Sequence, residues 1–335
     1  MRLLIIGPFP TPIGGVSIHL QRLKQLMEPE IDVYAVDESP VKKEGMPNIR
    51  FLNIISYFSL LRRADVLHVH SSVPIFRFMH IILGVYVFQK RVILTLHSFR
   101  NNKVKNWEQW LYRKCWKIIV VNEAYKQFIE NSNILYMPAF IPPLDVDFTE
   151  DLPLSLRKWL DLNRCVGNRI LVSNAFRLDF HNGVDIYGLD MALALMERLV
   201  LSNENVVLVF IVASLEKGKD VYDKYMKQIE LKGLEENIKL MGEAVNFPAL
   251  IAESDLVLRL TCTDGDALTV RESMWLNKRV LASDVVPRPE GCSLFKNRDA
   301  SDLYRKVKII LSEDNKEKNN EKFNYKNWYL NLYKA

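Results

Sequence analysis

The sequence lacks the features that mark an exported or membrane-embedded protein. Its longest uninterrupted apolar run outside the expected strands, residues 81–88, is far shorter than the roughly 20 residues that span a bilayer, which excludes a transmembrane helix. The first residues read as a buried strand entering a turn at Gly7, without the apolar core and small-residue cleavage site of a signal peptide. We therefore expect neither export nor membrane insertion.

Cysteine is scarce as well. The four cysteines are Cys115, Cys165, Cys262 and Cys292. They are widely scattered, which gives neither the close spacing of a metal site nor a disulfide framework. This usage fits a reducing, cytoplasmic location.

Composition and length indicate a two-domain globular protein. The chain has 335 residues, of which 49% are hydrophobic and 25% charged, and a prior of roughly 150 residues per domain gives two domains. The formal net charge is only +5, but it is unevenly distributed. Residues 1–150 hold 18 basic and 13 acidic residues, and residues 151–335 hold 27 of each. Within the first part, residues 50–126 hold 13 basic and only 3 acidic residues. An anionic partner is expected at that basic stretch.

Short β-rich apolar runs alternate with longer helical stretches, which is typical of βαβ units and a parallel sheet. Strands are expected over residues 3–6, 31–36, 66–70, 92–96 and 117–121, and again over 169–174, 206–213, 238–241, 256–260 and 279–283. Helices are expected over residues 16–27, 76–88, 107–116, 188–201, 220–231, 248–252 and 267–276. The sequence predicts an α/β fold of two Rossmann-like, doubly wound domains facing each other across a cleft.

The domain boundaries follow from changes in composition. We expect an N-terminal domain over residues 1–145, a linker over 146–166 and a C-terminal domain over 167–315, because proline-dense residues 137–143 and the acidic run that follows interrupt the alternation. In residues 316–335, aromatic and leucine side chains recur at helical spacing, which predicts a helix that packs back on the N-terminal domain.

Ligands of open α/β sheets bind at the carboxyl ends of the strands, so the loops there are the candidate sites. Residues 7–16 lead from a strand into a helix through Gly14 and Gly15, which permit close backbone approach to a phosphate at the helix start, or simply form a turn. The G-x-G-x-x-G spacing is absent, which argues against a nicotinamide oxidoreductase. After the first strand of the second half, Arg177 is suited to grip phosphate or to form a salt bridge with Asp179 or Asp185.

The stretch 259–275 is the most informative. A strand ends, a glycine turn with Asp264 and Asp266 follows, and a helix starts near Ala267 with Glu272 in its second turn. Carboxylates accept hydrogen bonds from sugar hydroxyls, and free N–H groups at a helix start bind phosphate. The alternative is that the two aspartates merely cap the helix.

The arrangement resembles the retaining glycosyltransferases of family 4, with the GT-B fold, of the bacterial polysaccharide and O-antigen type. The resemblance covers nearly the whole chain. It rests on Gly14-Gly15-Val16, on residues 94–98, on Phe176-Arg177-Leu178 with Gly183, and on residues 264–272 followed by 280–284.

The resemblance implies a role for each matching residue. Asp264 and the turn of Gly265, Asp266, Ala267, Leu268 and Thr269 would face the donor sugar and its diphosphate, and Glu272 would hold the ribose hydroxyls. Arg177 matches the phosphate-binding arginine of the family, and no metal or other cofactor is implied. The family lysine five residues later is Asn182 here, so His181, Arg259, Arg271 and Arg288 are candidates for the missing charge.

The histidines divide into three groups. His68 and His70 alternate on one strand and point to the same side, but no third ligand is evident, so we expect no zinc site. By resemblance, His97 lies near the reacting sugar, and His19 and His70 are candidates for the acceptor side. His80 is expected to be an ordinary helix residue.

The basic stretch interleaves its charges with large aromatic residues. They include Arg62, Arg63, Arg77, Lys90, Arg91, Arg100, Lys103, Lys105, Trp107, Trp110, Arg113, Lys114, Trp116 and Lys117. Such a pattern suits an anionic membrane surface, and no recognition motif for nucleic acid accompanies it. The alternative is an ordinary solvated surface with core aromatics.

These observations predict a metal-independent, retaining hexosyltransferase at the inner face of the cell membrane. It would use a nucleotide diphosphate sugar, expected to be a UDP-sugar, and a polysaccharide-precursor acceptor linked to undecaprenyl diphosphate, as in lipopolysaccharide synthesis. The alternatives are a nucleotide-sugar 2-epimerase of the same fold and a catalytically weak, membrane-peripheral partner subunit.

Overall fold

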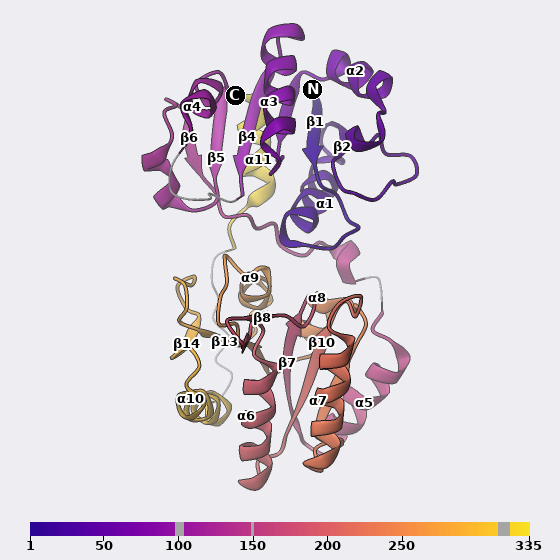
Figure 1. Cartoon of the computed structure of the whole chain (residues 1–335), viewed down its shortest axis with the longest axis vertical. Coiled ribbons are helices and arrows are strands. Elements are labelled where there is room, and N and C mark those ends of the chain that lie inside the picture. The colour runs from indigo at the N-terminus through magenta and orange to yellow at the C-terminus, as the bar shows by residue number, and fades with distance from the viewer. Residues whose placement is uncertain (98–103, 149–150, 314–321) are drawn as a thin grey trace. The chain divides into compact units, whose positions relative to one another are not determined.

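The computed structural model describes residues 1–97, 104–148, 151–313 and 322–335 (Figure 1). The chain divides into two compact units, the first formed by Met1–Ile141 with Phe323–Ala335 and the second by Pro142–Lys322. Each unit holds one six-stranded parallel sheet with helices on both faces. The predicted pair of doubly wound α/β domains is confirmed.

The first sheet has the strand order β2-β1-β3-β4-β5-β6. Its strands are β1 (Arg2–Gly7), β2 (Asp32–Asp37), β3 (Val66–Val69), β4 (Arg91–Leu96), β5 (Lys117–Val120) and β6 (Ile134–Tyr136). Strands buried on both faces read as continuous apolar runs, which is why the sequence reveals them. The edge strand β6 was not predicted, because it has three residues and none of them is buried.

Two layers of helices cover this sheet. On one face, α2 (Ile54–Arg63), α3 (Pro74–Ile82) and α4 (Asn106–Tyr112) contribute Tyr57, Ile81 and Leu111 to a core. On the other face lie α1 (Gly15–Met27) and α11 (Tyr325–Lys334), the yellow helix of Figure 1. The single helix expected over residues 76–88 is instead α3 followed by a π-helical turn, η2 (Leu83–Val87), and the helix expected to reach residue 116 ends at Tyr112. Short 3-10 helices occur at Ile49–Phe51 (η1) and Glu123–Phe128 (η3).

The second sheet has the order β11-β10-β7-β12-β13-β14. Its strands are β7 (Arg169–Ala175), β10 (Val206–Val212), β11 (Ile238–Met241), β12 (Leu256–Arg259), β13 (Val280–Ser283) and β14 (Ser293–Phe295). Its helices are α5 (Leu154–Cys165), α6 (Leu189–Leu201), α7 (Lys219–Leu231), α8 (Phe247–Ala252), α9 (Leu268–Trp275) and α10 (Ala300–Ser312).

The segment expected to be a linker is largely structured. Within residues 146–166, a 3-10 helix, η4 (Asp145–Phe148), and α5 belong to the second unit, which begins at Pro142. Helix α5 forms because Leu156 and Leu160, one turn apart, are buried in the core that lies on one face of the second sheet. Residues 149 and 150, also placed in the linker, lie outside the described residues, as do residues 316–321 of the expected C-terminal segment.

No helix in the described ranges is both long and apolar enough to cross a membrane. Several of the polar residues singled out by the sequence lie in loops that follow strands, namely His70 and His97 in the first unit and Arg177 and Asp264 in the second. The two sets are described separately below.

Candidate active site

The loop after β1 presents an open backbone at the start of α1. Gly14 is the N-cap residue, in an extended conformation, and Ser17 Oγ accepts a hydrogen bond from its N–H at 2.8 Å. A Cβ atom added to Gly15 would meet nothing within 4 Å, and one added to Gly14 would meet only Ser17 Oγ at 3.9 Å. Backbone N–H groups at a helix start with free space in front of them are suited to bind an anion.

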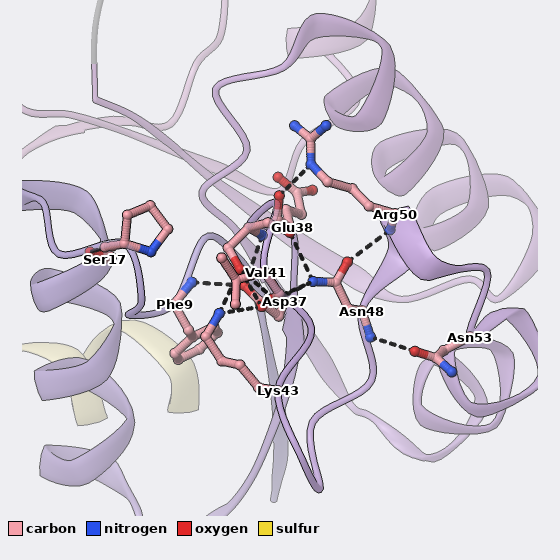
Figure 2. A network of polar contacts seen from close by, with 11 residues as sticks. Phe9, Ser17, Asp37, Glu38, Val41, Lys43, Asn48, Arg50 and Asn53 are labelled. Carbon is pink, nitrogen blue, oxygen red and sulfur yellow. Dashed lines mark hydrogen bonds and ion pairs between the residues drawn. The ribbon is translucent and has the colours of Figure 1, made fainter. Parts of the chain in front are cut away.

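A buried carboxylate anchors this loop to the neighbouring strand (Figure 2). Asp37, at the end of β2, accepts hydrogen bonds from the N–H groups of Phe9 and Ser39 at 3.0 and 2.9 Å and from Asn48 Nδ2 at 3.0 Å, and it forms an ion pair with Lys43. Burial alone would raise the pKa of Asp37, but hydrogen bonds from Lys43 and Ser39 outweigh it and keep the pKa below its ordinary value. This anchor was not predicted from the sequence.

Three histidines from different elements meet beneath the loop. His19 comes from α1, His70 follows β3 and His97 follows β4, and their ring centroids lie 5.2 to 5.5 Å apart. Nδ1 of His70 lies 2.9 Å from Nε2 of His97. His19 and His70 are almost fully buried and His97 is partly exposed, so His97 offers the accessible edge of the cluster.

Burial keeps these imidazoles neutral. It lowers the pKa of His97 to about 4 and that of His68 to about 3, and it lowers the pKa of His19 and His70 well below the ordinary value. A neutral imidazole both donates and accepts a hydrogen bond, which suits a group that contacts sugar hydroxyls.

Among the described residues, His19, His70 and His97 form the group that could hold a metal ion, with one nitrogen of each within 4.8 Å of the others. The rings of His70 and His97, however, have centroids 5.2 Å apart and nitrogens 2.9 Å apart, so they meet nearly end to end, as in a hydrogen bond. Two ligands of one tetrahedral ion converge on it at an angle instead. His68, whose ring nitrogens lie 2.7 Å from Tyr333 Oη and Thr95 Oγ1, is engaged in the core.

His80 is not an ordinary helix residue. It is buried, and its ring nitrogens lie 2.6 Å from Tyr57 Oη and from Glu38 Oε1. The expected place on a helix is correct, since His80 belongs to α3, and its side chain bridges α2 and the end of β2 inside the first unit.

In the second unit, Arg177 follows β7 and points its guanidinium at a neighbour. Its Nη2 lies 2.9 Å from Asp179 Oδ2, and about two fifths of each side chain is exposed. The salt bridge considered from the sequence is therefore present with Asp179. Asp185 instead accepts hydrogen bonds from Tyr225 Oη at 3.0 Å and from backbone N–H groups, including that of Leu189 at the start of α6.

Asn182 occupies a tight hairpin turn. Strands β8 (Phe180–His181) and β9 (Val184–Asp185) pair antiparallel, and Asn182 and Gly183 between them have φ values of +51° and +75°. Two consecutive positive φ values suit Asn-Gly, the preferred sequence of a two-residue hairpin. The turn explains why residue 182 is an asparagine. The Asn-Gly pair is the signal in the sequence that could have predicted this hairpin.

Asp264, in the loop after β12, is held by two arginines. Its carboxylate accepts hydrogen bonds at 2.9 Å from both Arg259 and Arg288, and at 3.0 Å from Thr261 Oγ1 and the N–H of Gly265. Burial alone would raise the pKa of Asp264, but the hydrogen bonds and charges of the arginines lower it to about 2. The carboxylate anchors the two guanidinium groups in this loop.

Helix α9 begins beside this cluster. Its N-cap, Ala267, makes no side-chain hydrogen bond, and Asp266 pairs with Arg271 at 2.6 Å, so neither aspartate caps the helix through its side chain. Gly265 has nothing within 4 Å of an added Cβ. Leu268 opens the helix, Thr269 donates to Asn174 Oδ1 at 3.1 Å, and Glu272 is buried.

The sequence and the fold were compared with known proteins. Residues 13–134 match the model of Glycosyltransferase Family 4. No curated protein matches the sequence.

Several solved structures share the fold. HepE of Anabaena, in complex with UDP and glucose, is 16% identical with a TM-score of 0.61, over 95% of this chain and 91% of that one. A glycosyltransferase from Rickettsia africae is 14% identical with a TM-score of 0.65, over 93% and 88%. The sucrose-phosphate synthase of Thermosynechococcus elongatus is 13% identical with a TM-score of 0.59, over 93% and 90%.

Proposed function

From the match of residues 13–134 to Glycosyltransferase Family 4 and the GT-B fold, we propose that this chain is a retaining hexosyltransferase that uses a UDP-sugar. The acceptor is a polysaccharide precursor linked to undecaprenyl diphosphate. The reaction proceeds without a metal ion, because cationic side chains and backbone N–H groups balance the charge of the diphosphate.

The observation that carries the proposal is the set of groups at the carboxyl edge of the second sheet. An open glycine turn, the start of α9 and the guanidinium of Arg177 all follow strands of that sheet. Such a combination of free N–H groups and a cation binds a diphosphate. HepE, which has this fold, was solved with UDP and with UDP-glucose, and this supports uridine as the nucleoside.

Catalysis would be electrostatic and positional. The bond between the anomeric carbon and the phosphate oxygen breaks, the acceptor oxygen forms the new bond on the same face, and the acceptor proton passes to the departing phosphate. Arg177 and the N–H groups at the start of α9 stabilise the charge on the leaving diphosphate. Glu272 accepts hydrogen bonds from the ribose hydroxyls.

The first unit, taken by itself, offers a second set of groups that suit a substrate. The open backbone at Gly15 binds an anionic group of a substrate, and neutral His97 donates a hydrogen bond to a sugar hydroxyl. His70 holds His97 through their 2.9 Å contact. Because His19 and His70 are almost fully buried, they support the acceptor site from behind rather than contact the acceptor directly.

A lipid-linked acceptor requires access to a membrane, and the first unit has a surface that suits it. We define the amphipathic face as the exposed apolar residues of η1, α2, α3, η2 and α4, namely Phe51, Leu52, Ile54, Ile55, Phe58, Ile75, Phe78, Tyr86, Val87, Trp107 and Trp110. The exposed bases Arg62, Arg63 and Lys105 lie on or beside the same helices. Exposed aromatics with interspersed bases favour the surface of an anionic membrane.

Part of the basic stretch lies elsewhere. Arg91 and Lys117 flank the Trp116 ring, at 4.6 and 4.2 Å from its centroid, and donate hydrogen bonds to the carbonyls of Tyr333 and Leu332 at the end of α11. Cations at a helix C-terminus stabilise it. These residues therefore belong to the fold, whereas Arg100 and Lys103, expected at the membrane, lie outside the described residues.

The test measures donor binding and transfer together. The purified chain is incubated with a panel of nucleotide sugars in the presence of EDTA, with and without a lipid extract of bacterial membranes, and its melting temperature and product formation are recorded. A bound donor at 100 times its Kd stabilises the chain by about 2.7 kcal/mol. We expect a UDP-sugar to stabilise it and the extract to be required for turnover.

Variants connect the activity to the proposed site. Arg177→Ala and Glu272→Ala should each reduce transfer, the first by about 100-fold or more, as for other groups that stabilise charge in the transition state. Arg305→Ala, which removes an exposed arginine of α10 paired with Asp302, is the matched control. Full activity in both site variants, or no stabilisation by any nucleotide sugar, would contradict the proposal. Turnover of the donor without an acceptor would favour the epimerase.

A further inference from the structure

Asp264 binds more donors than a carboxylate normally accommodates. Its Oδ2 accepts from Arg259 Nε and Arg288 Nη1 at 2.9 Å and from Thr261 Oγ1 at 3.0 Å, and its Oδ1 accepts from Arg259 Nη2 at 2.9 Å and from the Gly265 N–H at 3.0 Å. A carboxylate offers about four lone-pair sites. Asp264 therefore has no acceptor capacity left for a sugar hydroxyl.

The cluster of Arg259, Asp264 and Arg288 has one positive charge in excess and little contact with water. The three side chains are 13%, 8% and 2% exposed. The neighbouring pairs differ, because Arg177 with Asp179 and Arg271 with Asp266 are each neutral and more exposed. An uncompensated charge in a poorly solvated place is costly, and a bound anion removes that cost. The cluster is thus prepared for an anionic ligand.

The hydrogen bonds indicate which guanidinium meets the ligand. Arg288 is fixed on several sides, since it also donates to the carbonyl of Ser283 at 3.2 Å and points Nη2 at Ser283 Oγ. Arg259 uses Nε and Nη2 on Asp264, and within the described ranges its Nη1 has no hydrogen bond. Arg259 ends β12, at the same sheet edge as Arg177 and the turn at Gly265.

The position expected to supply a second cation does not do so. Asn182 lies in the β8–β9 turn, where its positive φ suits asparagine, and among the residues that the structure describes its side chain reaches only His181, at 3.4 Å. An uncharged amide there leaves one charge of the diphosphate unmatched by Arg177 alone.

We propose that Arg259 is the second phosphate-binding cation of this site and contacts a nucleoside diphosphate through Nη1, while Asp264 and Arg288 are positioning residues that hold its guanidinium. This inference rests on the proposed function, because it assigns the donor diphosphate to the same sheet edge. As the bond to the sugar breaks, the electron pair stays on the departing phosphate oxygen, and Arg259 stabilises the added charge.

The test uses calorimetric titration of the full chain with UDP and UMP. Arg259→Gln should weaken UDP binding at least tenfold and UMP binding much less, and Arg259→Lys should recover part of the loss because the charge returns without the fork geometry. Arg305→Gln, which removes an exposed arginine of α10 paired with Asp302, should leave the affinity ratio of UDP to UMP unchanged. In transfer assays kcat should fall more than KM rises for Arg259→Gln.

A second variant separates positioning from sugar contact. If Asp264 only positions Arg259, then Asp264→Asn weakens UDP and UDP-glucose by the same factor. A loss confined to UDP-glucose would make Asp264 a sugar ligand and overturn its proposed role. Thermal unfolding of each variant identifies any that does not fold, in which case the Arg259→Lys and Arg259→Gln pair decides.

The outcomes distinguish this inference from the proposed function. If the wild-type chain binds no uridine nucleotide, the proposed donor class is wrong. If it binds UDP and Arg259→Gln changes the affinity less than twofold, Arg259 does not contact the diphosphate and the inference alone fails.

Discussion

Acidification should destabilise the first unit through its buried histidines. In an unfolded chain a histidine has a pKa near 6.5 and gains a proton as the pH falls from 7.5 to 5.5. In the folded unit, burial lowers the pKa of His97 to about 4 and that of His68 to about 3, so both stay neutral. The unfolded state therefore binds more protons than the native state, and the free energy of unfolding must decrease as the pH falls below 6.5.

The size of the effect follows from these pKa values. Between pH 7.5 and pH 5.5, each of the two histidines removes about 1.4 kcal/mol of stability, or about 3 kcal/mol together. His19 and His70 act in the same direction, because burial lowers the pKa of each as well. A loss of this size is a large share of the roughly 5–15 kcal/mol that stabilises a folded protein.

The assay follows the unfolding of the first unit by urea at both pH values. Two of the six tryptophans, Trp159 and Trp275, lie in the second unit, and replacing them with phenylalanine leaves tryptophan fluorescence to the first unit. In that background, His68→Asn should reduce the loss between pH 7.5 and pH 5.5 by about 1.4 kcal/mol. His181→Asn, in the second unit, is the control and should leave the transition of the first unit unchanged. Equal losses with and without His68 would refute the reasoning.

Two further predictions concern the membrane and the backbone. Replacing Arg62, Arg63 and Lys105 with glutamine should weaken binding to anionic liposomes by about 1 kcal/mol per base and leave UDP binding unchanged. The matched control replaces Lys219, Lys224 and Lys227 of α7 in the same way. Equal sedimentation with liposomes in both sets of variants would show that the three bases have no special role at a membrane. Gly188→Ala should lower the free energy of unfolding of the second unit by about 3 kcal/mol or more, because φ is +73° and the new Cβ would lie 2.5 Å from the carbonyl oxygen of Leu260. Gly233→Ala, at φ +63° with nothing within 4 Å, should cost only about 1–2 kcal/mol in urea titrations, and equal losses in the two variants would contradict the steric explanation.

The central strands and most of the helices that join them could be predicted, because each strand buries both faces and each helix must return the chain to the same sheet edge. Elements with few buried residues were not predicted from the sequence. Helix α2 buries only Tyr57 and Leu61, α5 only Leu156 and Leu160, and β14 only Phe295. Two buried side chains four residues apart give too weak a period to separate a helix from a polar loop.

The positions of the candidate residues in the fold could be predicted more readily than the contacts they make. Loops after strands indicated Arg177 and Asp264 in the second sheet and His97 in the first, because topology brings the ends of parallel strands to one edge of each sheet. The contacts between side chains were not predictable, because they depend on the path of each loop. Arg259 and Arg288 lie 5 and 24 residues from Asp264, and no local pattern indicates that both bind it.

The return of the C-terminal segment to the first unit has a consequence for synthesis on the ribosome. Helix α11 buries Tyr329 and Tyr333 against the sheet formed by the first 141 residues, whereas the second unit is complete before α11 is translated. At about 5–20 residues per second, the roughly 180 residues in between take about 10 to 40 s to translate. Throughout that interval the apolar part of the sheet that α11 covers stays exposed, which favours aggregation of the nascent first unit until that helix is made.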